Sequence, residues 1–525
     1  MNENINYNVP KEKLVFANTN KNIHDKELAT KPIGYLKDAF NRFKKNKGSI
    51  VAAIIIMVLV LYAIIAPIFS PYSVAYHDTH YKYVLPKSNI SEVLNINFWD
   101  GCTEKSLPRE GFLYYYSMME ETGHDVIKNG EYEIKEEPLP AGKKAIKYEF
   151  RMDTYLAVGV VLDSTMSEEV YKSLQQYQDE TGIQVIYPIT DSNLRPKATQ
   201  DKADGNYWFK TDFVGEKTQA VVTENPDGTF SFENIYLPYS NGADEYTSKL
   251  RIEGENTYLY DYAIKNGNQY QVRYNYYEYY TFYHSYYLKD GIKEPLFLFG
   301  CTSSGQDIFT CLASGARFSF ILAIIVALVN LIVGAIYGAI EGYYGGKVDL
   351  IMERIVEILS AVPFMIVISL LKYHMEGSPQ VLILFIAFFV TGWIGMASRT
   401  RMQFYRFKNQ EYVLAARTLG AKDFRIMFKH IFPNALGTLI TGSVLVIPGM
   451  IFSETSLSYL GIINLNSGNM TSVGTLLANA QGRMTDYPHM MVFPAVFISL
   501  LMLSFNLFGN GLRDAFNPSL RGTEE

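Results

Sequence analysis

The chain has 525 residues, of which 48 % are hydrophobic and 19 % charged, and its formal net charge is −6. Apolar residues concentrate between Ser49 and Ser70 and again after Arg317, whereas residues 72–299 carry 35 acidic and 22 basic side chains. This segment therefore has a net charge of −13, and the rest of the chain one of +7. A basic frame around an acidic segment argues against a single soluble domain and indicates two compartments separated by a membrane. We expect no nucleic-acid partner.

Only three cysteines occur, Cys102, Cys301 and Cys311. Because they form no CxxC pair or Cys/His cluster, a structural zinc site or a redox motif is not expected. Cys102 and Cys301 both fall outside the membrane in the topology derived below. Whether they form a disulfide is left open, because a sequence does not establish the distance between two thiols.

The first candidate membrane span is SIVAAIIIMVLVLYAIIAPIFS, residues 49–70. A spanning helix needs roughly 20 mainly apolar residues, and this run supplies them. The alternative is a cleaved signal peptide, but the run starts late, exceeds the length of a signal peptide's apolar core and lacks an A-x-A exit. Lys and Arg residues precede it at 42, 44, 45 and 47, so we expect a retained helix with a cytoplasmic N-terminus.

Five further spans are expected in the C-terminal half, at about 317–342, 351–373, 379–399, 434–457 and 489–510. Together with the first span, they return the C-terminus to the cytoplasm. Between the fourth and fifth spans, residues 399–430 contain eight Lys and Arg residues against only Glu411 and Asp423. Six crossings place this basic segment in the cytoplasm and the acidic segment outside, as the positive-inside rule requires.

The cytoplasmic segment 411–434 reads EYVLAARTLGAKDFRIMFKHIFPN and is amphipathic. Gly420 followed by Ala421 permits a sharp bend between two short helices. Glu411 lies where a helix N-terminus favours negative charge, and Pro433 lies where the next span begins. Such a helix–bend–helix suits docking into another protein. An amphipathic helix lying on anionic lipid is the alternative, and composition leaves the two equally open.

This segment resembles the Glu-Ala-Ala loop of ABC importer permeases, in which Glu-Ala-Ala is followed by three residues, a glycine and, about a dozen residues later, a proline. The matching positions here are Ala415, Ala416, Gly420 and Pro433. Both alanines are small, good helix formers that allow another surface to approach closely. Leu414 stands at the glutamate position, so the salt bridge made by that glutamate is not carried over. Glu411 lies three residues earlier, as in the peptide/nickel branch of the family.

The resemblance covers about 295–522 and the first span. Further motifs of the family are matched in order by GGKVDLIMERIVEILSAVPF (345–364), SETSLSYLG (453–461) and FNLFGNGLRDAFNPSLRG (505–522). The C-type permease of oligopeptide and dipeptide importers is the most similar type. The family's GTDxxGRD motif before the second span becomes GCTSSGQD (300–307) here, where Thr302 and Gln306 replace Asp and Arg. Local contacts of that loop therefore cannot be transferred.

The resemblance implies an all-α membrane domain of six transmembrane helices, the type I ABC importer fold. We expect a permease subunit that forms half of a peptide pathway and is not itself an enzyme, because no GxxxxGK[ST] motif occurs. No cofactor or metal is expected in this chain, and ATP and Mg²⁺ would bind to partner subunits. The expected partners are a second homologous permease, two ATP-binding subunits, an extracellular substrate-binding lipoprotein and membrane lipid.

Coupling to the ATPase is assigned to the loop 400–433, at Glu411, Ala415, Ala416, Arg417, Gly420, Ala421 and Pro433. Ionisable residues within spans suggest functions of their own. Near the start of the third span, we expect Glu353, Arg354 and Glu357 to pair structurally rather than to contact substrate. Glu454, near the outer end of the fifth span, either faces the translocation path and meets a peptide amine or makes hydrogen bonds at the interface.

Residues 72–295 form an insert at a place where the family generally has a short loop. Runs of β-branched and aromatic residues predict strands, and SEEVYKSLQQYQDETG (167–182) predicts a helix with a serine cap and a closing glycine. We therefore expect a compact extracellular α+β domain. The tyrosines between Tyr258 and Tyr287 favour alternating strands over a carbohydrate or peptide site. No nucleophile motif or metal-ligand spacing predicts an enzyme.

The expected organisation is a cytoplasmic segment (1–48), the first span (49–70), the insert (72–295), a permease core with five helices (296–512) and a cytoplasmic tail (513–525). One alternative is a nickel or other small-solute ABC permease, because selectivity in the family rests largely with the binding protein. Another is a membrane-anchored extracellular binding protein or enzyme, for which five clustered spans and a docking loop would be superfluous.

Overall fold

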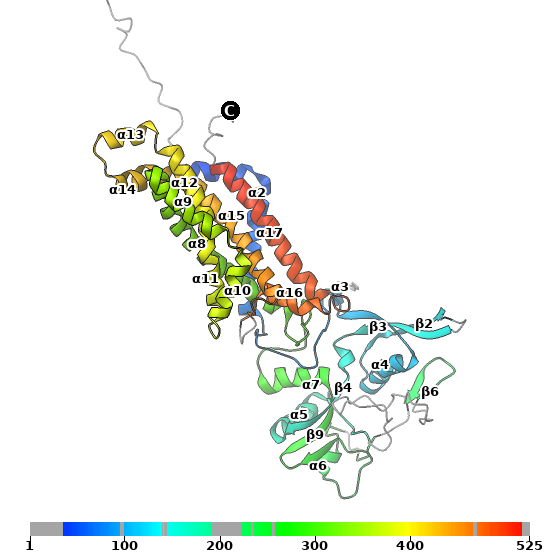
Figure 1. Ribbon diagram of the computed structural model, residues 1–525. Coiled ribbons are helices and arrows are strands. Elements are labelled where there is room, and N and C mark those ends of the chain that lie inside the picture. Colours follow the sequence, from blue (N-terminus) through cyan, green and yellow to red (C-terminus); the bar gives the residue numbers. More distant parts are fainter. Residues whose placement is uncertain are drawn as a thin grey trace, which may run out of the picture.

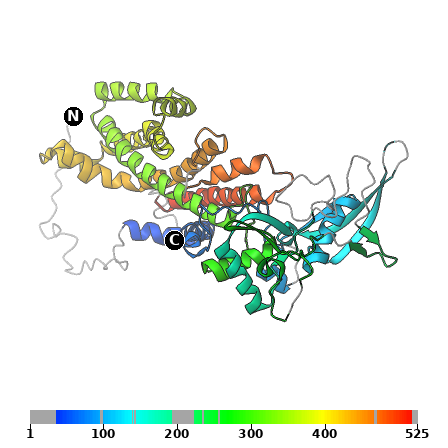
Figure 2. The ribbon, with the colours of Figure 1, turned by 90° about the horizontal axis from the view of Figure 1, so that it is seen from below.

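The computed structural model describes residues 35–94, 99–138, 140, 144–191, 222–232, 236–254, 258–465 and 470–516. Long helices form an elongated bundle, and an α+β insert lies at one end of it (Figure 1). The short helices α13 and α14 project from the opposite end. In both views the hairpin of β2 and β3 extends away from the bundle (Figure 1, Figure 2). The two functional regions expected from the sequence thus lie at opposite ends of the molecule.

Among the described residues, five helices are long and apolar enough to cross a membrane, and a bent helix pair is a sixth candidate. The five are α2 (Lys47–Phe69), α8 (Ile308–Tyr344), α11 with α12 (Gln380–Gly392 and Ile394–Phe407), the run α14–η5–α15 (Asp423–Arg425, Ile426–Ile431 and Phe432–Tyr459) and α17 (His489–Phe516). Two shorter helices flank them, α1 (Tyr35–Lys45) and α16 (Val473–Gln481). Each of the six spans expected from the sequence overlaps one of these helices or the bent pair.

The span expected at 351–373 is not one continuous helix. The chain forms α9 (Gly346–Ser360) and α10 (Phe364–His374), whose axes differ by 75°. Pro363 explains the break, because the residue before a proline is disfavoured in the helical region and proline cannot donate a backbone hydrogen bond. Pro363 itself is extended, with ψ 132°.

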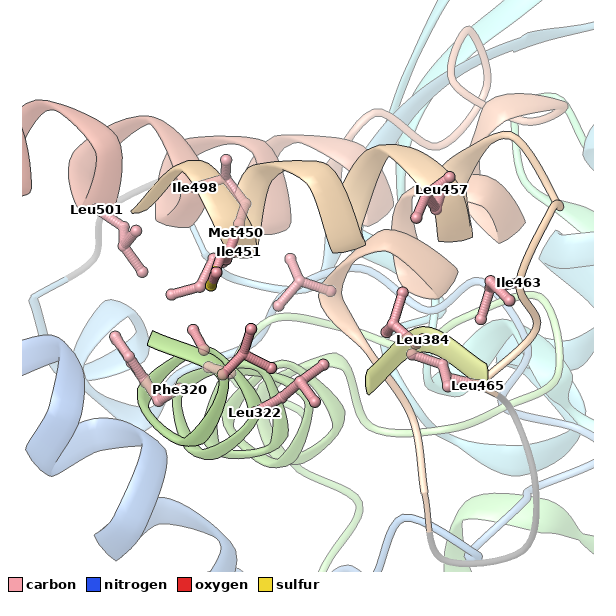
Figure 3. Packing of buried hydrophobic residues seen from close by; sticks show 14 of the residues in the cluster. Phe320, Leu322, Leu384, Met450, Ile451, Leu457, Ile463, Leu465, Ile498 and Leu501 are labelled. Carbon is pink, nitrogen blue, oxygen red and sulfur yellow. The ribbon is translucent and has the colours of Figure 1, made fainter. Parts of the chain in front are cut away.

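The central core of the bundle gathers around α8 and α15 (Figure 3). Phe320 and Leu322 of α8 face Met450 and Ile451 of α15, and Leu501 of α17 closes one side. All five side chains are less than a tenth exposed. By contrast, isoleucines and leucines on the outer faces of α2, α8 and α9 are about half exposed, as expected for helices surrounded by lipid rather than water.

The described part of the insert contains three antiparallel sheets. The first has the order β1–β3–β2 (Cys102–Leu107, Lys144–Asp153, Ile127–Pro138). The second has the order β4–β9–β5 (Val160–Ser167, Gln269–Asn275, Ile186–Tyr187), with β8 (Ala263–Asn266) also on β9, and the third pairs β6 with β7 (Val222–Glu224, Phe230–Phe232). Helices α3 (Asn89–Leu94), α4 (Arg109–Thr122), α5 (Glu168–Thr181), α6 (Glu245–Ser248) and α7 (Tyr276–Thr281) complete it.

The helix predicted at 167–182 is confirmed as α5. The Ser167 hydroxyl accepts a hydrogen bond from the backbone N–H of Val170, and Gly182 ends the helix in the left-handed conformation with φ +69°. A buried ion pair joins α4, which packs on the first sheet, to β9 of the second sheet: both carboxylate oxygens of Glu121 on α4 lie 2.7 Å from Nη2 of Arg273. The side chains of Arg273 and Glu121 are 0 % and 3 % exposed. The paired charges hold the two halves of the insert together.

The prediction of alternating strands across the tyrosine-rich segment is wrong after residue 275. Strand β9 ends at Asn275, whose side chain accepts a hydrogen bond from the N–H of Tyr277 and caps α7. The π-helical turn η4 (Phe282–Leu288) follows directly. The tyrosines then pack along helical faces, as with Tyr279 and Tyr283, whose ring centroids are 5.6 Å apart. A run rich in β-forming residues becomes helical here because aromatic rings four residues apart stack on one face.

The insert is joined to the bundle by short polar contacts. The Asp78 N–H donates to the Gly305 carbonyl at 3.0 Å, and a Cβ on Gly305 would lie 1.8 Å from the Asp78 carbonyl oxygen. Gly305 also has φ +76°, so no other residue fits there without a shift of the backbone. The Ser70 and Thr310 hydroxyls lie 2.6 Å apart across the outer ends of α2 and α8. The first contact joins the insert to the loop before α8, and the hydroxyl contact joins α8 to α2.

All three cysteines carry free thiols, and Cys301 is buried. The disulfide that the sequence left open between Cys102 and Cys301 is therefore not formed in this structure.

Candidate functional site

The segment 411–433 projects from the end of the bundle opposite the insert (Figure 1). Helix α13 (Glu411–Thr418) begins with Glu411 in its first turn, and the chain bends at Gly420, which has φ +82°. This bend was predicted from Gly420 and Ala421. The second helix differs from the prediction in one respect, because α14 and η5 continue without interruption into α15. Pro433 lies in the first turn of α15, as predicted. The bend is therefore joined to α15 by one continuous helix.

The inner side of this segment is packed onto the ends of α8 and α12. Val413, Ile426 and Ile431 are fully buried in a cluster with Ala339, Tyr343 and Phe404. The Tyr343 hydroxyl donates to Asp423 Oδ1 at 2.7 Å, and the Arg417 guanidinium lies over the Tyr343 ring at 5.8 Å. This segment is therefore held as a formed element against α8.

The outer side of the segment presents apolar side chains. Leu419 is 88 % exposed and Phe424 is 72 % exposed, and Leu414 is about half exposed. Among the other residues assigned to coupling, Ala415, Arg417, Gly420 and Pro433 are exposed, while Ala416 and Ala421 are half-buried. The structure thus brings all seven assigned residues into one projecting element, and it adds Leu419 and Phe424, which the sequence motif did not single out. Large exposed apolar residues on a projecting element indicate a contact with another protein or with the membrane surface.

A charge cluster beside this element was missed by the sequence. Arg401 on α12 makes two contacts with Asp349, from Nε to Oδ1 at 2.6 Å and from Nη2 to Oδ2 at 3.1 Å. It also lies 3.3 Å from Glu341 on α8 and 3.6 Å from Glu353 on α9. The signal available in the sequence was Glu341, a carboxylate inside an apolar span that requires a cationic partner. Arg401 therefore joins α8, α9 and α12 next to the coupling segment.

The pairing expected in the third span is partly confirmed. Arg354 forms an ion pair with Glu357 at i,i+3, on the exposed side of α9. Glu353 points instead toward Arg401.

Glu454 lies inside the subunit, with only 1 % exposure. Its carboxylate accepts hydrogen bonds from the hydroxyls of Ser319, at 2.7 Å, and Ser458, at 3.1 Å. Of the two alternatives drawn from the sequence, these contacts correspond to hydrogen bonding between α8 and α15. The burial contradicts exposure of the carboxylate to a peptide in this conformation.

The altered loop 300–307 keeps a structural role despite its changed residues. Gln306 donates to the Val74 carbonyl at 2.8 Å, and Thr302 accepts from the Gln306 N–H at 3.1 Å. The preserved Asp307 caps α8 by accepting from the N–H groups of Phe309 and Thr310. Burial raises the pKa of Asp307 from 3.8 to about 6, although these hydrogen bonds to the carboxylate act in the opposite direction. The cap at Asp307 explains why α8 starts nine residues before the expected span.

Within the described residues, no group of three or more His, Cys, Asp or Glu side chains is arranged to hold a metal ion. The residues of the site are instead an apolar projecting element and ion pairs at helix ends. Such an arrangement suits the transmission of movement between a partner protein and membrane helices.

Comparisons with known proteins define the class. Residues 333–522 match the family described as the binding-protein-dependent transport system inner membrane component. Residues 34–86 match the N-terminal transmembrane domain of oligopeptide transport permease C. The first matched region includes α2 and the first residues of the insert, and the second includes segment 411–433. The chain is thus a multi-pass membrane component of a transport system.

Individual relatives specify the family further. The chain is 44 % identical over 223 residues to the oligopeptide transport system permease protein of Bacillus subtilis (strain 168), a match that covers 42 % of this chain and 72 % of the relative. It is 42 % identical over 229 residues to the dipeptide transport system permease protein of the same organism, covering 42 % of this chain and 69 % of the relative. The chain therefore belongs to the oligopeptide and dipeptide permease family of ABC importers, and it is a permease subunit of an ATP-driven importer.

Among solved structures, the inward-facing MetNI methionine ABC transporter is similar with a TM-score of 0.34 and 16 % identity, covering 39 % of this chain and 96 % of that chain.

Proposed function

We propose that this permease forms half of a translocation pathway for peptides. The observation that carries the proposal is its 44 % identity over 223 residues to an oligopeptide transport permease. The second half of the pathway would be a homologous permease subunit, and a substrate-binding lipoprotein would deliver the peptide from outside. A nickel permease remains the competing possibility within the family, and transport measurements with both solutes separate the two.

The proposed topology has six spans, with both termini in the cytoplasm and residues 72–295 outside. Counting the bent pair α9 and α10 as one span gives six crossings. The charge distribution supports this orientation, because the end that carries α13 is rich in Lys and Arg, whereas residues 72–299 have a net charge of −13.

The coupling segment is proposed to dock into one ATP-binding subunit, and its counterpart on the second permease is proposed to dock into the other. These subunits would bind ATP and Mg²⁺, and their closing would push on α13 and, through the continuous α14–α15 helix, on the bundle. Leu419, Phe424 and Leu414 supply apolar contact area. Leu414 replaces the usual glutamate, so we expect apolar packing where the family uses a salt bridge.

Co-purification with the ATP-binding subunits tests this assignment. Gly420→Glu should abolish it, because Gly420 has φ +82° and the new side chain enters the interface. Gly377→Glu is the matched control: Gly377 has φ +85° and equally open surroundings, but it lies between α10 and α11 at the other end of the bundle. Retained ATPase binding and uptake in Gly420→Glu would contradict the coupling assignment.

A second variant avoids backbone strain. Leu419 is 88 % exposed, so Leu419→Glu leaves the fold intact. Burial of a leucine at an interface contributes about 1.5–3 kcal/mol, so its loss should weaken ATPase binding at least about tenfold. Unchanged binding by Leu419→Glu would remove this residue from the interface.

The insert is proposed to dock the substrate-binding protein or to cover the entrance of the pathway. Deleting 80–290 leaves the contact between Asp78 and Gly305 in place. We expect lower peptide uptake with unchanged assembly with the ATP-binding subunits. Normal uptake by the deletion variant would show that the insert has neither role.

A further inference from the structure

A basic hollow of about 430 Å³ lies between the ends of α12, α15 and α17. It is on the side of α15 away from the central core and at the end of the bundle where α13 projects (Figure 1). Its lining includes Arg399, Gln403 and Arg406 of α12, Thr438 and Leu445 of α15, and Arg513 of α17. None of the residues that line this hollow is among those assigned to coupling above.

Three guanidinium groups line the hollow, and no carboxylate does. Arg399 and Arg406 are seven residues apart, so they lie on the same face of α12 with Gln403 between them. The Arg399 Nη1 donates to the Gly442 carbonyl at 3.0 Å, which is a neutral partner. Arg513 has only a loose contact of 3.8 Å with the neighbouring Asp514, and both side chains are more than half exposed. Among the described residues, the lining of the hollow therefore has a net positive charge.

The polarity of the hollow changes with depth. Arg399 is fixed at the level of Gly442 on α15, and Leu445 lies three residues further into the bundle, against Gly509 of α17. A rise of 1.5 Å per residue places Leu445 about 4.5 Å deeper than Gly442. Arg406 lies about 10 Å from Arg399 in the opposite direction, toward the end of α12. The cationic and hydroxyl groups thus lie nearer the end of the bundle that carries α13, and the Leu445 side chain lies deeper in the bundle.

We propose that this hollow binds the phosphate headgroup of an anionic phospholipid of the cytoplasmic leaflet. The proposal rests on the orientation given under the proposed function, which puts α13 and the three arginines on the cytoplasmic side. Guanidinium groups bind phosphate oxygens through paired hydrogen bonds, and basic pockets between membrane helices at this side suit such headgroups. The acyl chains would pass Leu445 toward the bilayer centre.

Gly442 has a specific part in the site. A Cβ at this position would lie 2.6 Å from Arg399 Nη1, so the glycine allows the guanidinium to lie flat against α15. Gly442→Ala therefore displaces the tip of a flexible side chain while keeping every charge. Since only Arg399 has to move, the helix packing is retained.

Lipid binding by the purified complex of permease and ATP-binding subunits tests the proposal. Phosphatidylglycerol should raise the unfolding temperature of the wild type, and phosphatidylcholine should do so less. Arg399→Gln combined with Arg406→Gln should lower the affinity for phosphatidylglycerol about thirtyfold, because each basic residue near a lipid surface contributes about fivefold. Gly442→Ala should give an intermediate loss.

A matched pair of substitutions removes two charges elsewhere at the same end. Lys347 and Arg354 are exposed on α9, and Lys347→Gln combined with Arg354→Gln should leave the affinity unchanged. An equal loss in this control would overturn the proposal, since binding would then reflect total charge. Equal protection of the wild type by inorganic phosphate would also overturn it, because the site would then bind a soluble anion rather than lipid.

The same samples distinguish this proposal from the proposed function. Arg399 and Arg406 lie outside the coupling segment, so their variants should still co-purify with the ATP-binding subunits. Weakened lipid binding with intact co-purification supports the lipid site independently. A wild type that shows no preference for phosphatidylglycerol while retaining its ATPase partners would refute the lipid site alone.

Discussion

Replacing Arg401 should destabilise the permease more than replacing any other arginine at the end of the bundle that carries α13. Arg401→Gln leaves the carboxylates of Glu341, Asp349 and Glu353 gathered around a neutral side chain. At 3.3 Å from Glu341, the gross attraction at an effective dielectric constant of 20 is about 5 kcal/mol. Removing one partner of a buried pair costs about 3–5 kcal/mol, and the 26 % exposure of the Arg401 side chain puts the expected loss at the lower end, about 3 kcal/mol.

Thermal unfolding of the purified complex, followed by intrinsic fluorescence, measures this loss. Arg399→Gln is the control two residues earlier on α12, because it removes one hydrogen bond to a carbonyl and should cost only about 1–2 kcal/mol. Adding Glu341→Gln to Arg401→Gln should restore part of the stability, since the most buried charge is then neutral. Equal effects of Arg401→Gln and Arg399→Gln, or no recovery in the double variant, would refute the role assigned to the cluster.

Three further predictions concern the coupling segment, the insert and the N-terminal end of α8. Tyr343→Phe removes the hydrogen bond to Asp423 and should lower the amount of peptide transported per ATP hydrolysed, with ATPase binding retained; an unchanged ratio would exclude this contact from coupling. Ser167→Ala should cost about 1 kcal/mol and speed hydrogen exchange in α5 selectively, whereas uniform exchange would contradict the cap. The pKa of Asp307 is raised to about 6, so its charged form is disfavoured in the folded state. The stability of the wild type relative to Asp307→Asn should therefore fall as the pH rises from about 4 to 6. A stability difference that does not depend on pH would contradict the raised pKa.

Much of the membrane part could be predicted because its signals are local. Apolar runs locate spans, and the charge of their connecting loops orients them, so each predicted span overlaps a helix or the bent pair. The motif around Gly420 located the projecting bend because glycine adopts the left-handed conformation more readily than other residues. The break at Pro363 was also readable in the sequence, but the apolar run continues through it and conceals the change of direction.

Other features depend on contacts between residues far apart in the chain. Arg401 and Asp349 are 52 positions apart, and only the packing of α9 against α12 reveals their pairing. The exposure of Leu419 and the burial of Glu454 likewise follow from packing, and neither is encoded in a spacing. Between Tyr258 and Tyr287 of the insert, the aromatic content favoured strands. The cap at Asn275 and the stacking of rings four residues apart instead make the chain helical after residue 275.

Uptake by the reconstituted transporter tests the central claim most directly. Proteoliposomes containing this permease, its permease partner, the two ATP-binding subunits and the binding lipoprotein should accumulate a labelled oligopeptide when ATP is supplied on the cytoplasmic side. Accumulation should stop with ADP, and it should be reduced by Leu419→Glu, whose side chain is 88 % exposed. ATP-dependent accumulation of nickel without peptide, or peptide uptake in vesicles that lack this chain, would contradict the assignment of this permease to peptide import.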